Sequence, residues 1–194
     1  MRERPADFHA LPAELPVPKD DGAADHLLNA ELPSIVLRAT RGEPVDLAAV
    51  AEDGVLVVYV YPRTGVPGQP LPEGWDSIPG ARGCTPESCA FRDSAAELTG
   101  LGATVFGLSS QSLDEQREFA QREHLPYPLL NDCERRLAEG LGLPTFSAGG
   151  RSYYRRLTFI ARRGRLLKVF YPVFPPQDNP AEVIAWLRTQ PRVD

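Results

Sequence analysis

The sequence predicts an α/β fold in which helices flank a central mixed β-sheet. Strand-like and helical segments alternate along most of the 194 residues, and the chain ends on two adjacent strand segments followed by a helix. A hydrophobic content of 42% is enough for a sizeable core, and the length favours one domain with appended segments over two full domains. We expect that domain to occupy residues 32–190.

Residues 1–31 are expected to form an irregular N-terminal arm. Four prolines interrupt the arm, and it shows little periodicity beyond one helical turn at residues 23–29. The domain then opens with residues 35–47, which suit a short hairpin turning at Arg41-Gly42. A helical turn is expected to follow at residues 47–52.

The run VLVVYVY at residues 55–61 predicts a central strand. Its unbroken β-branched and aromatic character is typical of a strand covered on both faces of a parallel or mixed sheet. Residues 62–83, by contrast, contain five prolines and five glycines, a composition that blocks both helix and strand. We expect a long loop there, and loops of this length are usually functional or mobile.

The rest of the chain continues the alternation of helix and strand. Helices are expected at residues 86–99, 113–123, 134–141 and 181–188, and strands at residues 103–108, 127–130, 156–161 and 166–171. The last two strands are joined by the turn Arg162-Arg163-Gly164. This ββα ending is the thioredoxin-like arrangement, so the predicted fold is a thioredoxin-like sandwich.

Composition and charge exclude several functional classes. The net charge of -5 gives no basic field for attracting phosphate backbones, so no nucleic-acid partner is expected. No apolar stretch approaches the roughly 20 residues that cross a bilayer, and the first residues do not resemble a signal peptide. We therefore expect no membrane partner and a cytoplasmic location. Three cysteines are too few for a disulfide-stapled secreted scaffold.

Cys84 is the candidate nucleophile. It follows Gly83 where the glycine-rich loop enters a helix, and Pro86 suits the first turn of that helix. Unpaired backbone N–H groups and the helix dipole stabilise a thiolate there by about 0.3 to 1 kcal/mol, which predicts a lowered pKa for Cys84. The alternative is that Cys84 and Cys89 are buried small hydrophobic residues.

Cys89 is the nearest second thiol, five positions further along the same helix. In a regular helix this spacing separates the Cα atoms by roughly 8 to 9 Å, beyond the roughly 7 Å limit for a disulfide. A bond between the two cysteines would therefore require the first turns to unwind. Cys133 has acidic neighbours and is expected to be a partly exposed thiol, in reserve as the resolving partner.

No metal site is expected from the spacing of the candidate ligands. The chain has no CxxC pair and no HxxxH pair, and His9, His26 and His124 are scattered along the sequence.

The string GCTPESCAFRD at residues 83–93, together with VVYVYP at residues 57–62, resembles the peroxiredoxin Q or bacterioferritin-comigratory subfamily of peroxiredoxins. The likeness covers the chain from about residue 32 to residue 190. It implies a thioredoxin-fold thiol peroxidase that reduces hydrogen peroxide and organic hydroperoxides. It also implies a monomer or weak homodimer, recycled by a thioredoxin-like dithiol and needing no metal or organic cofactor.

The resemblance also implies roles for three residues. Cys84 corresponds to the peroxidatic cysteine, Cys89 to the helix-borne resolving cysteine that forms an intrachain disulfide with it, and Arg156 to the arginine that stabilises the thiolate. A guanidinium stays protonated and presents fixed donors to an anion, which agrees with that role. Without the resemblance, Arg156 would be read as a surface arginine beside Arg155.

The loop before Cys84 departs from the family pattern. The family places a proline seven residues and a threonine or serine three residues before the reactive cysteine, and here those positions are Ser77 and Ala81. Read from Pro62 instead, residues 69–83 become an insertion. We hypothesise that Pro62 keeps the shielding role and that Thr64 supplies the hydroxyl.

Two further residues near Cys84 carry a hydroxyl group. Ser77 and Thr85 are the alternative sources of the active-site hydroxyl if Thr64 does not supply it. The inserted residues, with Trp75 and Ile78, are expected either to form an apolar lid over the site or to be a rigid surface loop.

Two other functions remain open. One is a thiol-disulfide oxidoreductase, although such enzymes rely on CxxC and the spacing here is CxxxxC. The other is a redox sensor or interaction protein on a peroxiredoxin fold that is oxidised without turnover.

Overall fold

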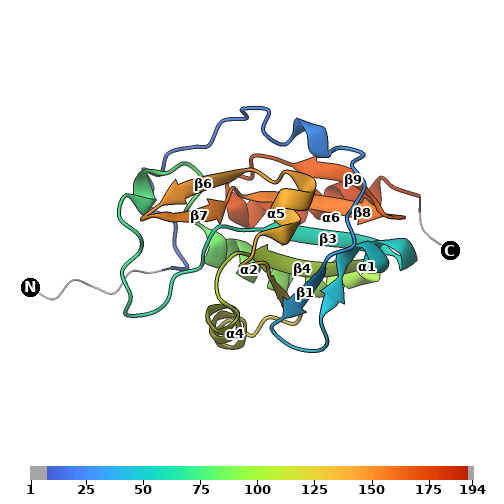
Figure 1. Ribbon diagram of the computed structural model, residues 1–194, viewed down its shortest axis with the longest axis horizontal. Helices are drawn as coiled ribbons and strands as arrows, with labels where there is room; N and C mark the ends of the chain where they lie inside the picture. The colour runs from blue at the N-terminus through green and yellow to red at the C-terminus, as the bar shows by residue number, and fades with distance from the viewer. Residues whose placement is uncertain (1–7, 192–194) are drawn as a thin grey trace, which may run out of the picture.

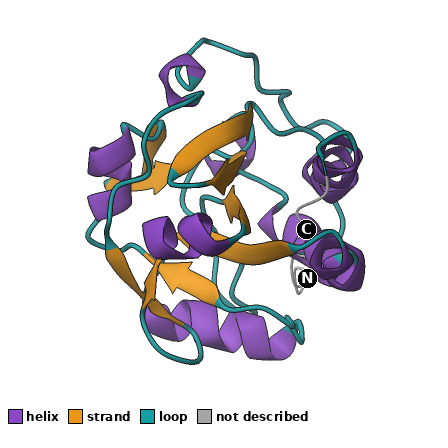
Figure 2. Ribbon diagram, turned by 90° about the vertical axis from the view of Figure 1, so that its right-hand side faces the viewer, coloured by secondary structure: helices purple, strands orange, loops and turns teal. Residues whose placement is uncertain are grey.

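The computed structural model describes residues 8–191, and it centres on a seven-stranded mixed sheet (Figure 1). The strand order is β2-β1-β5-β4-β3-β8-β9. These strands are β1 (Val36–Ala39), β2 (Val45–Asp46), β3 (Val55–Val60), β4 (Ala103–Ser109), β5 (Leu129–Asn131), β8 (Leu157–Arg162) and β9 (Arg165–Phe170). Helices lie on both sides of the sheet (Figure 2), so the predicted fold class is confirmed.

β3 is the central strand that its composition predicted. It pairs in parallel with β4 and antiparallel with β8, so both of its edges are hydrogen-bonded. Side chains alternate across its two faces with the period of two that a strand imposes. Leu56 and Val58 join one core cluster, whereas Val57 and Tyr59 join the other.

Six α-helices and three short 3-10 helices surround the sheet in the described part of the chain. The α-helices are α1 (Leu47–Asp53), α2 (Cys84–Asp93), α3 (Ala95–Gly100), α4 (Leu113–Arg122), α5 (Arg136–Leu141) and α6 (Asn179–Arg188). The 3-10 helices are η1 (Asp25–Leu27), η2 (Trp75–Ser77) and η3 (Pro176–Asp178). One core cluster contains buried residues of α1 and α5, and the other contains residues of α2, α4 and α6.

The helix expected at residues 86–99 differs from the observed one in two respects. It begins two residues earlier, at Cys84, because Gly83 takes a left-handed φ of 104° and acts as the N-cap. It also divides at Ser94, which has φ -94° and ψ -1° and separates α2 from α3. A β-carbon on Gly83 would lie 2.3 Å from Pro176, so only glycine fits both the conformation and the space.

A hairpin of β6 (Thr145–Ala148) and β7 (Arg151–Tyr154) was not expected from the sequence. It forms a separate two-stranded sheet, and its turn uses Gly149 and Gly150 at positive φ. The hairpin lies beside the long loop of residues 62–83 (Figure 1). Trp75 of the loop is buried against Phe146 and Tyr153, so the loop is anchored by a small apolar cluster of its own.

Within residues 8–31, the N-terminal arm is irregular apart from η1 and an isolated bridge from Glu31 to Arg165, yet it packs closely on the domain. Ala24 and Leu27 belong to a main core cluster, and Leu32 N–H donates to the carbonyl of Gly164. The domain boundary at residue 32 therefore remains a prediction.

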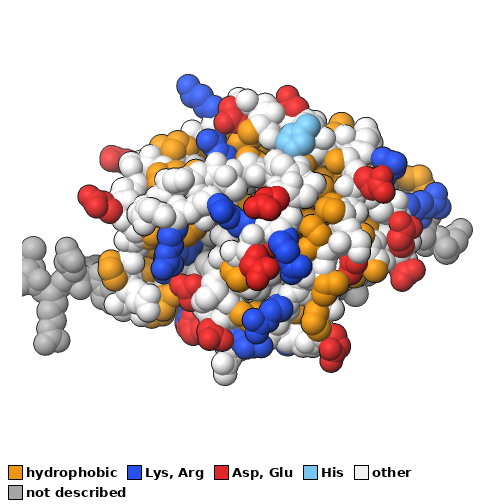
Figure 3. Space-filling view, in the orientation of Figure 1, with side chains coloured by type: hydrophobic (Ala, Val, Ile, Leu, Met, Phe, Trp, Pro, Cys, Tyr) orange, Lys and Arg blue, Asp and Glu red, His pale blue; other side chains and the backbone are white. Residues whose placement is uncertain are grey.

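On the face shown in Figure 3, acidic and basic side chains are interspersed. Within residues 8–191, no helix combines the length and the apolar character needed to span a membrane.

Candidate active site

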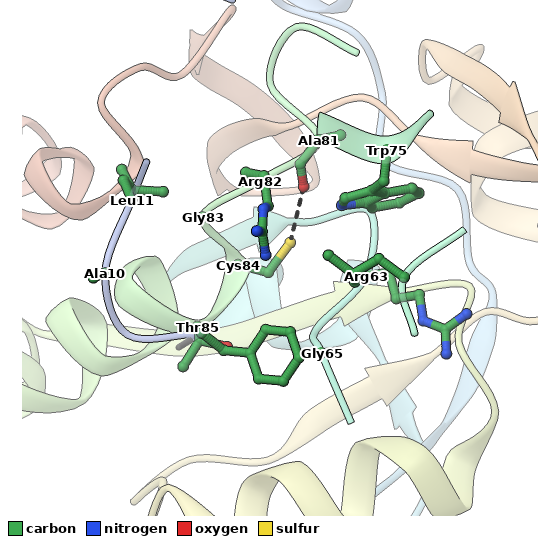
Figure 4. A pocket seen from close by; sticks show the side chains of 12 residues that line it. Ala10, Leu11, Arg63, Gly65, Trp75, Ala81, Arg82, Gly83, Cys84 and Thr85 are labelled. Atoms are coloured by element: carbon green, nitrogen blue, oxygen red, sulfur yellow. Dashed lines mark hydrogen bonds between the residues drawn. The ribbon is translucent and has the colours of Figure 1, made fainter. Parts of the chain in front are cut away.

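Cys84 is the first residue of α2 and lines a small pocket. Its side chain is 2% exposed, and its thiol donates to the carbonyl of Ala81 at 3.8 Å (Figure 4). The backbone N–H of Glu87 bonds to the carbonyl of Gly83, which closes the first turn of the helix. The glycine-rich loop and the helix start therefore place the sulfur where the sequence predicted.

Arg156, immediately before β8, contacts the Cys84 sulfur. Its Nη2 donates to Sγ at 3.1 Å and also to the carbonyls of Gly80 and Arg82, while Nη1 forms a buried ion pair with Glu87. Arg156 is 3% exposed, so it is a buried residue and not the surface arginine of the alternative interpretation. Four partners fix its plane against the sulfur.

The pKa of Cys84 is raised, which is opposite to the direction expected from the helix start. Complete burial is the largest cause, and the Glu87 carboxylate adds to it. The Arg156 guanidinium and a hydrogen bond from the Arg63 backbone act in the other direction. Desolvation exceeds these stabilising contacts, so burial raises the pKa of the Cys84 thiol although a fixed cation lies beside it.

Glu87 sits between the reactive thiol and its arginine. Burial raises the pKa of its carboxyl from 4.5 to about 7, although Arg156 opposes the shift. The carboxyl therefore changes charge near neutral pH, and it does so one ion pair away from Cys84. The sequence indicated only that Glu87 lies in the first turn of the helix that begins near Cys84. The contact between Glu87 and Arg156 is seen only in the folded structure.

The cavity above Cys84 is small, about 20 Å³. A water-sized molecule needs roughly 10 to 15 Å³ of such space, so the cavity fits a very small substrate. Leu71 and Trp75 of the long loop line the cavity, and so do Phe8 and Leu11 of the N-terminal arm. Trp75 and Leu11 lie on different sides of Cys84 (Figure 4). Both the loop and the arm therefore contribute to the walls of the cavity, and the role of the loop as an apolar lid remains a prediction.

Pro62 and Thr64 flank Arg63, whose backbone faces the sulfur. The Pro62 carbonyl accepts a hydrogen bond from the Ser109 hydroxyl at 3.1 Å. Thr64 is 1% exposed, and both its N–H and its hydroxyl donate to the side-chain oxygen of Gln111. Their roles remain predictions, and the sequence reasoning missed Arg63 because its contact is made by the backbone.

The two substitute hydroxyls lie in different environments. Thr85 is buried and lines the Cys84 cavity. Ser77 donates to the Gly74 carbonyl at 2.7 Å in an exposed part of the loop.

Cys89 lies half-buried on α2, and all three cysteines are free. Its thiol donates to Glu123 at 3.5 Å. Burial, followed by the Glu123 carboxylate, raises the pKa of Cys89 to about 11. Both cysteines belong to the same unbroken helix, so a disulfide between them requires unwinding of α2. Cys133 is exposed.

Known proteins resemble this chain over most of its length. The Redoxin family matches residues 27–184. Peroxiredoxin Bcp of Bacillus subtilis is 30% identical over 165 residues, which cover 83% of this chain and 94% of that protein. Chloroplastic peroxiredoxin Q of Sedum lineare is 29% identical over 160 residues, or 81% of this chain and 75% of that protein.

Solved structures agree with this relationship. The peroxidoxin BcpB of Mycobacterium tuberculosis superposes with a TM-score of 0.69 at 26% identity, covering 84% of this chain and 97% of that one. A Xanthomonas campestris peroxiredoxin Q gives a TM-score of 0.65 at 23% identity, covering 86% and 98%.

A buried cysteine at a helix start, held by an arginine in a thioredoxin-like fold, defines a thiol redox protein. The chain belongs to the Redoxin family, and within it to the peroxiredoxins of the Bcp or peroxiredoxin Q group.

Proposed function

We propose that this protein is a thiol peroxidase in which Cys84 reduces the peroxide and Cys89 resolves the product. The observation that supports the proposal most strongly is the 3.1 Å contact between the buried Arg156 guanidinium and the buried Cys84 sulfur. There a fixed cation stabilises the thiolate and the charge that develops on the peroxide oxygen.

The reaction proceeds in two steps that balance. The Cys84 thiol loses its proton and its sulfur attacks one peroxide oxygen, so that an S–O bond forms and the O–O bond breaks, and the leaving oxygen takes up a proton and departs as water or an alcohol. The Cys89 thiol then loses its proton and its sulfur attacks the sulfur of the Cys84 sulfenic acid, so that the S–S bond forms, the S–O bond breaks, and the hydroxyl group leaves with a proton as water. A thioredoxin-like dithiol reduces that disulfide by exchange.

Hydrogen peroxide is the substrate that best fits the closed cavity, and organic hydroperoxides require the cover to move. A structure of the Xanthomonas campestris bacterioferritin comigratory protein was described for its alkyl peroxide reduction activity. We extend that substrate class to this chain, with Phe8 and Trp75 as the side chains that a larger hydroperoxide displaces.

Pro62 and Thr64 complete the proposed site, with Pro62 as the shield and Thr64 as the hydroxyl. Thr64→Val tests the second role directly. Retention of the full peroxidase rate would transfer the role to Thr85 or Ser77. A monomer or weak homodimer and a cytoplasmic location remain predictions.

The test of the proposed function is peroxide turnover with a thioredoxin system. Cys84→Ser should abolish it, Cys89→Ser should permit one turnover and then stop, and Cys133→Ser should leave it unchanged. Steady-state activity in Cys84→Ser would overturn the proposal. Loss of turnover in Cys133→Ser, with Cys89→Ser still active, would instead reassign the resolving role to Cys133.

A non-turnover redox sensor is the second candidate, and the raised pKa of Cys84 favours it. A thiol attacks a peroxide far more slowly than a thiolate. Slow, stoichiometric oxidation of Cys84 without turnover would support the sensor.

A further inference from the structure

The fold brings a histidine, a cysteine and a carboxylate together beside the active site. His9 comes from the N-terminal arm, Cys89 from α2, and Glu123 from the end of α4. Their ligand atoms all lie within 4.8 Å of one another. The sequence places these residues far apart, so motif spacing gave no sign of the group.

Two distances within this group are close to those between the ligands of a tetrahedral metal site. His9 Nε2 lies 3.6 Å from one Glu123 oxygen, and Cys89 Sγ lies 3.5 Å from the other. Zinc bonds of roughly 2.0 to 2.3 Å at tetrahedral angles place ligand atoms about 3.4 to 3.6 Å apart. The ligand atoms all lie within 4.8 Å of one another, so a shared ion requires the side chains to draw together from that spacing.

The local charge also favours a cation. Arg122 contacts Glu123, and Arg92 donates to the backbone carbonyl of Glu123, so two positive groups lie nearby. Each of these arginines is paired with a further carboxylate, Arg122 with Glu118 and Arg92 with Asp93. The Glu123 carboxylate and a Cys89 thiolate add two negative charges, whereas Arg122 and Arg92 each divide their positive charge between this group and a further carboxylate.

We propose that His9, Cys89 and Glu123 form a Zn²⁺ site in the reduced protein, with water in the fourth position. Imidazole, thiolate and carboxylate are all zinc ligands, and three protein ligands with one open position are a known zinc arrangement. The ion displaces the Cys89 proton to solvent on binding.

Zinc at this site inhibits resolution, a consequence that rests on the proposed role of Cys89. A sulfur that ligates zinc cannot attack the Cys84 sulfenic acid, and a Cys89 already in a disulfide cannot bind zinc. The ion also fixes His9, next to Phe8, whose ring lines the Cys84 cavity. Bound zinc therefore holds the N-terminal arm over the Cys84 cavity. It also prevents Cys89 from attacking the sulfenic acid.

The test is a Co²⁺ titration of the reduced full-length protein without oxygen, followed by Zn²⁺ competition. We expect one Co²⁺ per chain, with tetrahedral visible bands and a thiolate charge-transfer band. His9→Ala and Glu123→Gln should weaken binding by at least about tenfold, because changes even beyond the ligand shell cost that much. Cys89→Ser should remove the charge-transfer band. His124→Asn and Cys133→Ser, which change exposed residues outside the group, are the matched controls.

A missing thiolate band in the wild type, or wild-type affinity in His9→Ala, would overturn the site. His9→Ala alters an exposed side chain, so its result does not depend on the buried Glu123 variant folding. Peroxide turnover with and without Zn²⁺ then tests the inhibition, which a chelator should reverse and His9→Ala should reduce. If zinc binds but does not change the turnover rate, the proposed inhibition is wrong and the proposed metal site still stands. The titration needs no peroxide, so its outcome is independent of the proposed peroxidase activity.

Discussion

Removing the Tyr127 hydroxyl should speed disulfide formation between Cys84 and Cys89. Tyr127 donates to the backbone carbonyl of Ser88 at 2.9 Å, within the segment that must unwind. Tyr59 donates to the Ser88 hydroxyl at 3.1 Å and lies 3.2 Å from the Tyr127 oxygen. Both tyrosines therefore hold the helical form of α2, and neither bond to Ser88 is expected to persist in the unwound form.

The size of the effect follows from one hydrogen bond. Tyr127→Phe removes a net contribution of about 1 kcal/mol from the helical state. Disulfide formation proceeds from the unwound state of α2, which is a minor species in the reduced protein. A loss of about 1 kcal/mol from the helical state raises the population of the unwound state about fivefold, because 1.4 kcal/mol corresponds to a factor of ten in an equilibrium constant. The rate of disulfide formation should rise by the same factor, whereas peroxide attack on Cys84 in the helical state should change little.

The assay is stopped-flow tryptophan fluorescence after mixing reduced protein with hydrogen peroxide. Trp75 lines the Cys84 cavity and serves as the reporter, and acid quenching with mass analysis identifies the disulfide. Tyr154→Phe is the matched control, since it removes a buried tyrosine hydroxyl that donates to Asp132, away from α2. A resolution rate in Tyr127→Phe equal to that of the wild type would refute the idea that these bonds limit unwinding.

Three further predictions concern the pocket. Arg156→Lys keeps the charge but loses the planar fork, so the second-order rate with hydrogen peroxide should fall by about 100-fold; an unchanged rate in stopped-flow would contradict this role. Phe8→Ala opens the cover, so the ratio of kcat/KM for a bulky aryl hydroperoxide to that for hydrogen peroxide should rise. Val17→Ala, at an exposed arm residue, is its control, and a ratio equal in both variants would count against the cover. The pKa of Glu87 is raised from 4.5 to about 7, so between these pH values the folded protein keeps a proton on Glu87 that the unfolded chain releases. The contribution of Glu87 to the free energy of unfolding is therefore fully present below pH 4.5 and is lost as the pH rises to about 7. The free energy of unfolding of the wild type, relative to Glu87→Gln in denaturant titrations, should fall by up to about 3 kcal/mol over that range; parallel pH profiles would show that Glu87 is not the group that titrates.

Elements with a strong local pattern could be predicted from the sequence. The run at residues 55–61 is central because its composition suits burial on both faces, and β3 occupies that position. Gly83 and Pro86 marked the start of a helix, and α2 begins beside them. The β6–β7 hairpin was missed although Gly149-Gly150 lies between aromatic residues, a usual hairpin signal.

Properties that depend on contacts between distant segments could not be predicted. The helix start predicted a lowered pKa for Cys84, but Phe8, Leu11 and Trp75 close the pocket, and burial raises it instead. The environment of Glu87 depends in the same way on Arg156, which is 69 positions away in the sequence. Local patterns indicate where a residue lies on its own element, whereas the electrostatics of a site depend on what the other elements bring to it.

The most direct test of the proposed Cys84 and Cys89 roles is to oxidise the reduced protein with one equivalent of hydrogen peroxide and map the products by mass spectrometry. We predict a single disulfide that joins Cys84 to Cys89, with Cys133 still available to an alkylating reagent. A bond from Cys84 to Cys133, or a Cys84 thiol that survives the peroxide unchanged, would contradict the account.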